Sequence, residues 1–117
     1  MPLLTLTDAF AAEAVYMVGI KGSGMSALTE LLVEKGVAVS GSDTAEPFYT
    51  DEVLKRLGVK YHENFDANRI NSNIDVVVHS AAYPRDSHPE LLRAQELGIP
   101  VLNYPEALGE LSLGCDA

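Results

Sequence analysis

The sequence is poor in residues that could cross-link the chain or bind metal. It contains one cysteine, Cys115, and no tryptophan. A single thiol cannot form a disulfide within the chain or supply a metal-ligand set, and no histidine pair stands at helical spacing, so we expect no metal site. One unpaired cysteine fits a reducing compartment, and we expect a cytoplasmic protein.

Basic residues are also scarce. Eight Lys and Arg stand against seventeen Asp and Glu, which gives a formal charge of −9 at pH 7. The mean field of such a surface repels phosphate backbones and anionic membranes, so neither nucleic acid nor a membrane is an expected partner. Apolar runs stay well below the roughly 20 residues that span a bilayer, and the first residues lack the basic start of a secretion signal.

The length and the remaining composition are those of one globular domain. The chain has 117 residues, of which 47% are hydrophobic and 21% charged. A domain of this size buries enough apolar surface for one sheet covered by a few helices. We divide the chain into an N-terminal extension, residues 1–14, and a single domain, residues 15–117.

Apolar strand-like runs alternate with amphipathic helical segments along the whole domain. Strands are predicted at residues 15–20, 37–43, 59–62, 74–80 and 99–103, and helices after Gly24, at 50–58, up to Leu97 and at 104–111. Such alternation predicts the α/β class, a Rossmann-like open sheet of about five mostly parallel strands with helices on both faces. Residues 64–73 are rich in Asn and Asp and predict a loop or a short irregular helix.

The helix before Leu97 carries a start signal of its own. Ser87, His88, Pro89 and Glu90 match a capping box with proline in the first turn. We therefore expect Ser87 to be the N-cap and Glu90 to turn back toward it.

A glycine-rich loop, residues 19–26, joins the first strand to the first helix. Its three glycines let main-chain N–H groups approach an anion, and the helix N-terminus adds a partial positive charge, so the loop predicts a phosphate or diphosphate site. Lys21 stands where the dinucleotide fingerprint has its second glycine. Two interpretations of Lys21 are open: its side chain pairs with a phosphate, or it is a solvated turn lysine.

Ser42 and Asp43 end the second strand. An acid about twenty residues after a glycine loop commonly accepts a hydrogen bond from a ribose hydroxyl or a base, which makes Asp43 a candidate ligand contact. The alternative is that Ser42 and Asp43 cap the next turn.

Two further segments follow strands of the predicted sheet. His62 follows the third strand, although a lone histidine is more often structural. Residues 80–83 follow the fourth, where small side chains would let a ligand pass close to the backbone. The chain lacks the G-x-x-x-x-G-K-[ST] loop of nucleotide triphosphate sites and the G-x-S-x-G elbow of serine hydrolases, so no catalytic residue is assigned.

Taken together, five segments in order resemble the N-terminal domain of the Mur ligases. They are "VYMVGIKGSGMSAL", "VSGSD", "YHENF", "DVVVHSAAYPRDSHPEL" and "GIPVLNYPEALGEL", and they span roughly residues 14 to 112. The first loop of that family typically has the form G-I-G-G-x-G-M-S, which this chain matches except at Lys21. The alanine-adding branch of the family is the most similar.

The resemblance implies a domain that holds the UDP part of a UDP-N-acetylmuramate substrate during peptidoglycan synthesis. It places the diphosphate on the loop of Gly22, Ser23, Gly24, Met25 and Ser26, and the uridine end near Ser42 and Asp43. His62, Ser80, Ala81, Ala82 and Tyr83 would line the path to the sugar. The domain itself would hold no cofactor, whereas ATP and magnesium are implied for the full-length enzyme, whose missing ligase domains would act in cis or in trans.

Other functions remain open from the sequence. A related ligase that recycles cell-wall peptide onto the same UDP-sugar shares these motifs. The segment "LNYPEAL" also lacks the arginine that commonly stands there in the family. Outside the family, an NAD(P)-binding module with Asp43 on the adenosine ribose is the alternative, and an interaction domain with an idle site is a third possibility.

Overall fold

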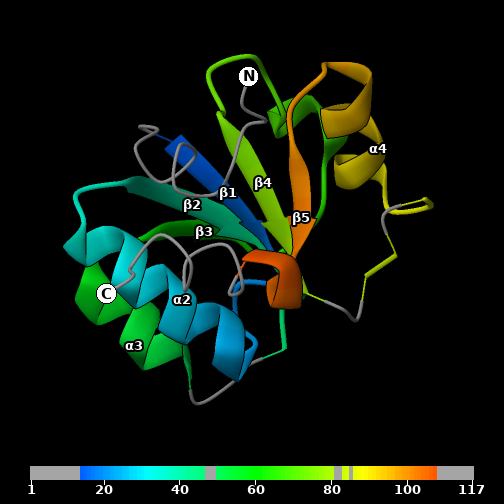
Figure 1. Ribbon diagram of the computed structural model, residues 1–117. Coiled ribbons are helices and arrows are strands. Elements are labelled where there is room, and N and C mark those ends of the chain that lie inside the picture. Colours follow the sequence, from blue (N-terminus) through cyan, green and yellow to red (C-terminus); the bar gives the residue numbers. More distant parts are fainter. Residues whose placement is uncertain (1–13, 47–49, 81–82, 85, 108–117) are drawn as a thin grey trace.

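The computed structural model of the protein describes residues 14–46, 50–80, 83–84 and 86–107, and five strands of this part form one parallel sheet in the order β3-β2-β1-β4-β5 (Figure 1). The strands are β1 (Ala14–Val18), β2 (Ala38–Ser42), β3 (Lys60–His62), β4 (Val76–His79) and β5 (Val101–Asn103). The predicted fold class, with its five-stranded parallel sheet, is confirmed.

The centre of the sheet is formed by β1, which pairs with β2 on one side and β4 on the other. Every residue of β4 is buried, and so are all residues of β1 except the first. Parallel strands covered on both faces carry continuous apolar runs of this kind rather than an alternating pattern.

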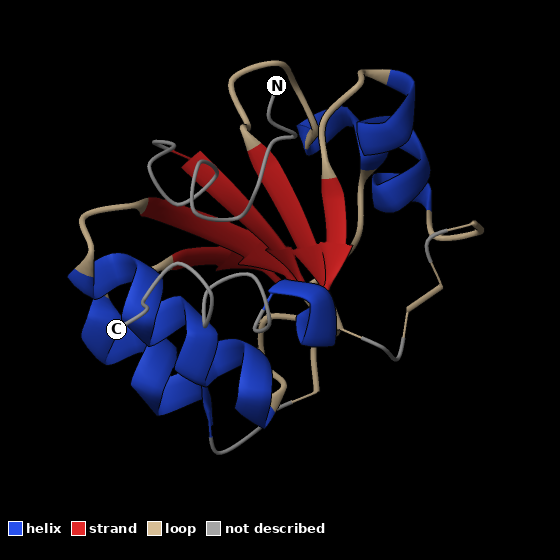
Figure 2. Cartoon of the chain, viewed as in Figure 1, coloured by secondary structure: helices blue, strands red, loops and turns tan. Residues whose placement is uncertain are grey.

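Helices cover both faces of the sheet, as predicted (Figure 2). The helices α2 (Ser23–Glu34) and α3 (Thr50–Leu57) pack on one face through Met25, Leu28, Leu32 and Leu54. The helix α4 (Pro89–Glu96) packs on the other through Leu91 and Ala94, beside the short 3-10 helix η1 (Ala67–Arg69). Two separate apolar cores result, one on each side of the sheet.

The start of α4 differs from the predicted capping box. The N-cap is His88 rather than Ser87, and His88 Nδ1 accepts the hydrogen bond from the Glu90 amide at 3.2 Å. Pro89 occupies the first helical position, where its missing N–H costs nothing. Because the helix begins one residue later, the side chain of Glu90 points into the protein instead of back to the N-cap.

Most of the other predicted boundaries shift by one or two residues. Ala14, which we had placed in the N-terminal extension, opens β1 and pairs with Ala38. The predicted irregular segment contains η1, and the last predicted helix is present over residues 104–107. Residues 1–13, Ala81, Ala82 and Cys115 lie outside the described residues. The helices of the described part are all too short or too polar to cross a membrane.

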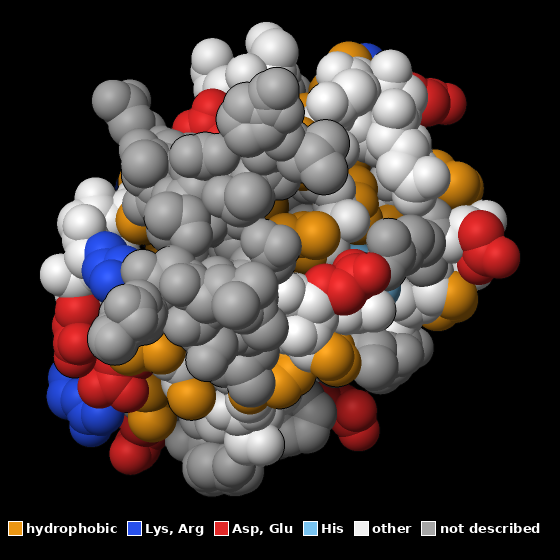
Figure 3. All heavy atoms as spheres, in the orientation of Figure 1, with side chains coloured by type: hydrophobic (Ala, Val, Ile, Leu, Met, Phe, Trp, Pro, Cys, Tyr) orange, Lys and Arg blue, Asp and Glu red, His pale blue; other side chains and the backbone are white. Residues whose placement is uncertain are grey.

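The acidic excess of the chain does not gather in one patch on the face shown in Figure 3. Asp and Glu side chains are scattered over that face, one near its middle and the others around its rim, and Lys and Arg side chains lie beside some of them at its left edge.

Candidate anion-binding loop at the carboxyl edge of the sheet

The loop after β1 is held against the ends of its neighbouring strands. The amides of Gly19 and Ile20 both donate to the carbonyl oxygen of Ser42, at 2.8 and 3.2 Å. Gly19 has a φ of +84°, and a Cβ added there would stand 2.7 Å from the Ser80 Cβ. Only glycine satisfies both conditions, so the chain turns here in the narrow space between β2 and the segment after β4.

The first turn of α2 is open at its N-terminus. Gly22 is the N-cap, makes no side-chain cap hydrogen bond, and is followed by a first turn without an acidic residue. Ser23 is exposed, whereas the side chains of Met25 and Ser26 are buried. Main-chain N–H groups at a helix start, together with the helix dipole, favour an anion, so this turn can accept a phosphate group.

Gly24 leaves space for an aromatic ring at the same helix start. A Cβ on Gly24 would lie 2.8 Å from Cζ of Tyr104, so the ring packs directly on the helix backbone. The predicted diphosphate residues, 22–26, thus form the N-cap and first turn of α2, where Ser23 is exposed and Met25 and Ser26 are buried.

Asp43 fixes this loop through both carboxylate oxygens. One oxygen accepts the amide of Lys21 at 2.9 Å; the other accepts the amide of Thr44 at 2.7 Å and the hydroxyl of Tyr83 at 3.3 Å. Burial and the charge of Asp43 raise the pKa of Tyr83, so this hydroxyl remains a donor. The geometry corresponds to the capping alternative for Asp43, and its contact with a ribose stays a prediction.

Ser42 points away from the loop, into the core on the α4 side. Its hydroxyl is fully buried and donates to Oε1 of Glu90 at 2.6 Å. Glu90 Oε2 accepts the hydroxyl of Tyr16 at 2.9 Å and the amide of Asp66 at 3.0 Å, and Arg69 lies 3.6 Å away. Burial, followed in effect by the charge of Glu90, raises the pKa of Tyr16 to about 12, despite an opposing hydrogen bond from Ser42.

Neither sequence interpretation of Lys21 is correct. Its side chain is completely buried, so it is not a solvated turn residue, and its ammonium group faces protein oxygens rather than the loop surface. Nζ donates to Oε2 of Glu63 and to the carbonyl oxygen of Glu46, each at 2.8 Å, and lies 3.6 Å from Asp51. Burial lowers the pKa of Lys21, but the bond to Glu63 and the charges of Asp51 and Glu63 outweigh it, so the pKa is raised.

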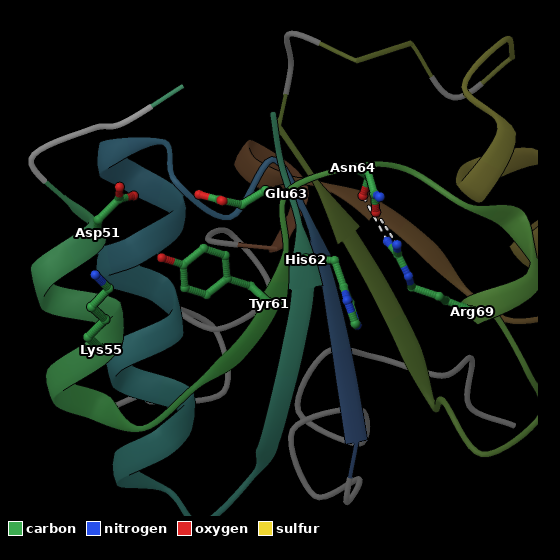
Figure 4. Close-up of a pocket in the computed structure, with 7 residues that line it drawn as sticks. All are labelled: Asp51, Lys55, Tyr61, His62, Glu63, Asn64 and Arg69. Atoms are coloured by element: carbon green, nitrogen blue, oxygen red, sulfur yellow. Dashed lines mark hydrogen bonds between the residues drawn. The ribbon is translucent and has the colours of Figure 1, made fainter. Parts of the chain in front are cut away.

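His62 is exposed at the end of β3 and lines a shallow polar hollow (Figure 4). The hollow is lined by Asp51, Lys55, Tyr61, His62, Glu63, Asn64 and Arg69. In Figure 4, Tyr61 extends toward α3, whereas His62 points away from it. Arg69 donates to both the side chain and the main chain of Asn64, which fixes the far wall. One strand, β2, lies between β3, which ends at His62, and β1, which leads into the glycine loop.

Ser80 and Tyr83 lie on the other side of the glycine loop. The Ser80 amide continues the sheet by donating to the Val18 carbonyl at 2.9 Å, and the ring of Tyr83 lies against Gly19. The same ring makes edge contacts with Phe65 and His88, at centroid distances of 5.3 and 5.2 Å. Of the predicted ligand path, Ser80 and Tyr83 are thus brought beside the loop.

Sequence reasoning missed the two buried charged residues that organise this edge, Lys21 and Glu90. Each had a signal in the sequence. Lys21 stands at a position that is glycine in the dinucleotide fingerprint, and Glu90 is free to point inward because His88, rather than Ser87, can serve as the N-cap. Within the described residues, His, Cys, Asp and Glu side chains form no group of three or more that could hold a metal ion.

The sheet order and the open helix start define an α/β domain with a candidate anion-binding loop at the carboxyl ends of its strands. Residues 14–114 match the model described as "Mur ligase family, catalytic domain". The match covers most of the chain, and the chain belongs to the Mur ligase family.

Curated relatives agree with this assignment. UDP-N-acetylmuramate–L-alanine ligase of Treponema pallidum is 50% identical over 108 residues, which cover 92% of this chain and 22% of the relative. The enzyme of the same name from Borreliella burgdorferi is 46% identical over 101 residues, 84% of this chain and 22% of the relative. The chain therefore spans about a fifth of the length of these relatives.

Solved structures show the same fold. UDP-N-acetylmuramate-alanine ligase of Thermotoga maritima superposes with a TM-score of 0.72 at 28% identity, covering 81% of this chain and 21% of that one. UDP-N-acetylmuramate:L-alanyl-gamma-D-glutamyl-meso-diaminopimelate ligase of Neisseria meningitides gives a TM-score of 0.74 at 28% identity, covering 85% of this chain and 31% of that one.

Proposed function

We propose that this chain is the UDP-binding N-terminal domain of a UDP-N-acetylmuramate–L-alanine ligase, an enzyme of peptidoglycan synthesis. The observation that carries the proposal is the open first turn of α2, which stands on a loop fastened to the ends of β2 and β4. The 50% identity to a relative of that name supports the choice of enzyme.

The names of the two solved relatives support the choice of ligand. One acts on alanine and the other on a tripeptide, but both names begin with UDP-N-acetylmuramate. Both enzymes have this fold, and both names include the same UDP-sugar, so binding of the UDP-sugar is the function that a shared domain would serve. We therefore assign the UDP-sugar, and not the amino acid, to this domain.

The main chain of the first turn would carry the diphosphate. The amides of Ser23, Gly24 and Met25 lie at the helix start, with Gly22 and Ser26 on either side. The uridine end is assigned to the neighbourhood of Ser42 and Asp43, whose side chains hold the walls of that site. His62 and the segment Ser80, Ala81, Ala82 and Tyr83 are assigned to the path toward the sugar.

By itself this domain is not expected to catalyse. In the full-length enzyme the substrate carboxylate is phosphorylated and the amino group of alanine then attacks the acyl phosphate, which are steps that we assign to the remaining ligase domains. The ATP and magnesium for these steps would be held there too, with those domains joined in cis or in trans, and we place the enzyme in the cytoplasm. This domain would contribute binding and orientation of the UDP-sugar.

An NAD-binding role is not favoured. Lys21 stands where the dinucleotide fingerprint has the glycine that lets the pyrophosphate come close, and the relatives are named as UDP-N-acetylmuramate ligases. Titration calorimetry of the 117-residue chain with UDP-N-acetylmuramate and with NAD separates the two. We expect binding of the UDP-sugar only; binding of NAD without the UDP-sugar would overturn the proposal.

One substitution tests the main-chain amides directly. Ser23→Pro removes a single N–H at the first helical position, where proline is well tolerated, and Gly22 already has the extended backbone that precedes proline, with φ −58° and ψ 147°. We expect affinity for UDP-N-acetylmuramate to fall by about tenfold or more, the worth of a hydrogen bond to a charged group.

Ser23→Ala is the matched control for this test. It removes the hydroxyl of the same exposed residue and keeps the amide, so we expect affinity within about twofold of the parent chain. If the proline variant is folded by circular dichroism and binds as well as the parent, the helix start is not the diphosphate site.

A further inference from the structure

Lys21 is the one lysine or arginine among the described residues whose side chain is fully buried, and it lies inside the glycine loop. Its ammonium group contacts three segments that come from different parts of the chain. They are the turn after β2 at Glu46, the start of α3 at Asp51 and the residue after β3 at Glu63, at distances of 2.8, 3.6 and 2.8 Å. The side chain thus joins the loop to the whole β2–α3–β3 unit.

The backbone of Lys21 is held as firmly as its side chain. The amide donates to Oδ2 of Asp43 at 2.9 Å, and the carbonyl oxygen accepts the hydroxyl of Thr50 at 2.5 Å. Amide, carbonyl and ammonium are therefore all bonded, and they point in different directions. A loop residue fixed at three points leaves its neighbours, Ile20 and Gly22, little freedom to move.

The charge of Lys21 is neutralised inside the protein. Two carboxylates face the single ammonium group, so the cluster carries no excess positive charge toward the loop surface. An anion at the start of α2 would meet main-chain N–H groups and not this lysine. Any effect of Lys21 on anion binding must then pass through the shape of the loop.

From this arrangement we propose that Lys21 is a positioning residue: it fastens the loop 19–22 to α3 and β3 and so holds the N-terminus of α2 in the geometry that receives a diphosphate. The inference rests on the proposed function. Preorganised donors bind more tightly than donors that must be ordered when the ligand arrives.

The test compares two ligands that differ only in phosphate. Lys21→Met keeps the length and apolar stem of the side chain and removes the ammonium group. We expect its affinity for UDP to fall about tenfold and its affinity for uridine to stay within about twofold, because uridine makes no use of the diphosphate loop. Lys60→Met, at an exposed position of β3, is the control and should change neither affinity.

Equal losses for UDP and uridine, or no loss for either, in a folded Lys21→Met chain would overturn the positioning role. Should that variant not fold, Glu63→Gln serves instead, since the Glu63 side chain is half exposed and the variant loses only the charge of one partner. Its affinity for UDP should fall by about threefold, while its affinity for uridine should stay unchanged.

Hydrogen exchange of the chain without ligand separates this inference from the proposed function. The amides of Gly19 and Ile20 donate to the Ser42 carbonyl, and that of Gly22 donates to the Gly19 carbonyl. We expect all three to exchange at least about tenfold faster in Lys21→Met, while the amides of β4 stay unchanged. Unchanged exchange at the loop overturns the positioning role even if UDP binds. If the parent chain binds neither UDP nor UDP-N-acetylmuramate, the proposed function falls, and the ligand role of Lys21 falls with it.

Discussion

Besides Asp43 at the end of β2, each side of the sheet buries one charged side chain near the carboxyl ends of its strands, and these two are held in opposite ways. On the α3 side the ammonium group of Lys21 meets two carboxylates and a carbonyl oxygen. On the α4 side the carboxylate of Glu90 meets two hydroxyls and a main-chain amide, with Arg69 at 3.6 Å. The cation is held mainly by opposite charge, and the anion mainly by neutral donors.

The exposure of the groups that contact Lys21 and Glu90 determines how much each buried charge contributes to stability. The Glu63 side chain is 50% exposed and can regain water when Lys21 is removed. The hydroxyls of Tyr16 and Ser42 are buried and cannot. Leaving a buried donor without an acceptor carries the full desolvation penalty, so the Glu90 cluster should contribute more to stability than the Lys21 cluster.

The largest effect is expected at Glu90. Glu90→Gln keeps the shape of the side chain but sets an amide N–H₂ group against donors that include the Asp66 amide. We expect the free energy of unfolding to fall by about 3 kcal/mol, the lower end of the cost of breaking a buried charged network. Urea unfolding followed by circular dichroism measures it.

Glu96→Gln is the matched control on the same helix. Its side chain is 67% exposed and its ion pair with Arg93 spans one helical turn, so it should change stability by less than about 0.5 kcal/mol. If Glu90→Gln loses no more than Glu96→Gln, the difference that we infer between the two clusters is wrong.

A second prediction uses alkaline pH to weaken the Glu90 cluster without altering its carboxylate. The pKa of Tyr16 is raised to about 12, from about 10 in the unfolded chain. Its contribution is therefore complete below pH 10 and is lost as the pH rises through 12, by about 2 kcal/mol. The pKa values of Tyr61 and Tyr83 are raised as well, so the test is the difference from Tyr16→Phe. Parallel stability curves for parent and variant between pH 9 and 12 would contradict the prediction.

The third prediction concerns the stability of Lys21→Met. The methionine retains the apolar stem and Glu63 can become hydrated, but Asp51, whose side chain is only 18% exposed, also loses the charge of Lys21. We therefore expect the free energy of unfolding to fall by about 1 to 2 kcal/mol, less than for Glu90→Gln. Thermal and urea unfolding beside Lys60→Met measure the loss. A loss equal to that of Glu90→Gln would mean that the two clusters are energetically alike, against the comparison above.

The fold could be predicted from the sequence because its signals are local. Apolar runs such as residues 74–80, ended by glycine or polar residues, mark the strands, and the acid-to-base order along residues 50–58 marks α3. The cap of α4 was misplaced because Ser87 and His88 are both able to accept from the helix amides. Only the position of the first turn decides between them.

The site could be predicted only as far as its main chain. Glycines mark where the backbone turns, and so the glycine-rich loop could be predicted as a candidate anion site. The partners of Lys21 are 25 to 42 residues away in sequence, at Glu46 and Glu63, and those of Glu90 are up to 74 residues away. Pairings of that separation depend on which strands become neighbours, and the pattern along the chain does not contain this information.

The smallest effect is expected at acidic pH and again separates the two sides. His88 Nδ1 accepts the Glu90 amide, which puts the ring proton on Nε2; His79 Nδ1 faces the Ser80 carbonyl at 3.0 Å, which puts its proton on Nδ1. Burial lowers the pKa of His88, the charge of Glu90 opposes this, and His79 adds to the lowering. Stability from His88 is thus present above its unfolded pKa of about 6.5 and is lost as the pH falls below it.

His88→Asn keeps an N-cap acceptor and removes the titrating group, so its unfolding free energy should vary less between pH 7 and 5 than that of the parent. The Lys21 side should contribute nothing to this slope, because the raised pKa of Lys21 keeps it charged throughout that range. The prediction fails if the unfolding free energy of His88→Asn depends on pH as that of the parent does. It also fails if this pH dependence disappears in Lys21→Met, because the acid-sensitive group would then lie on the Lys21 side of the sheet. A reduced slope confined to His88→Asn would show that the stability of the fold responds to acid through the cap of α4.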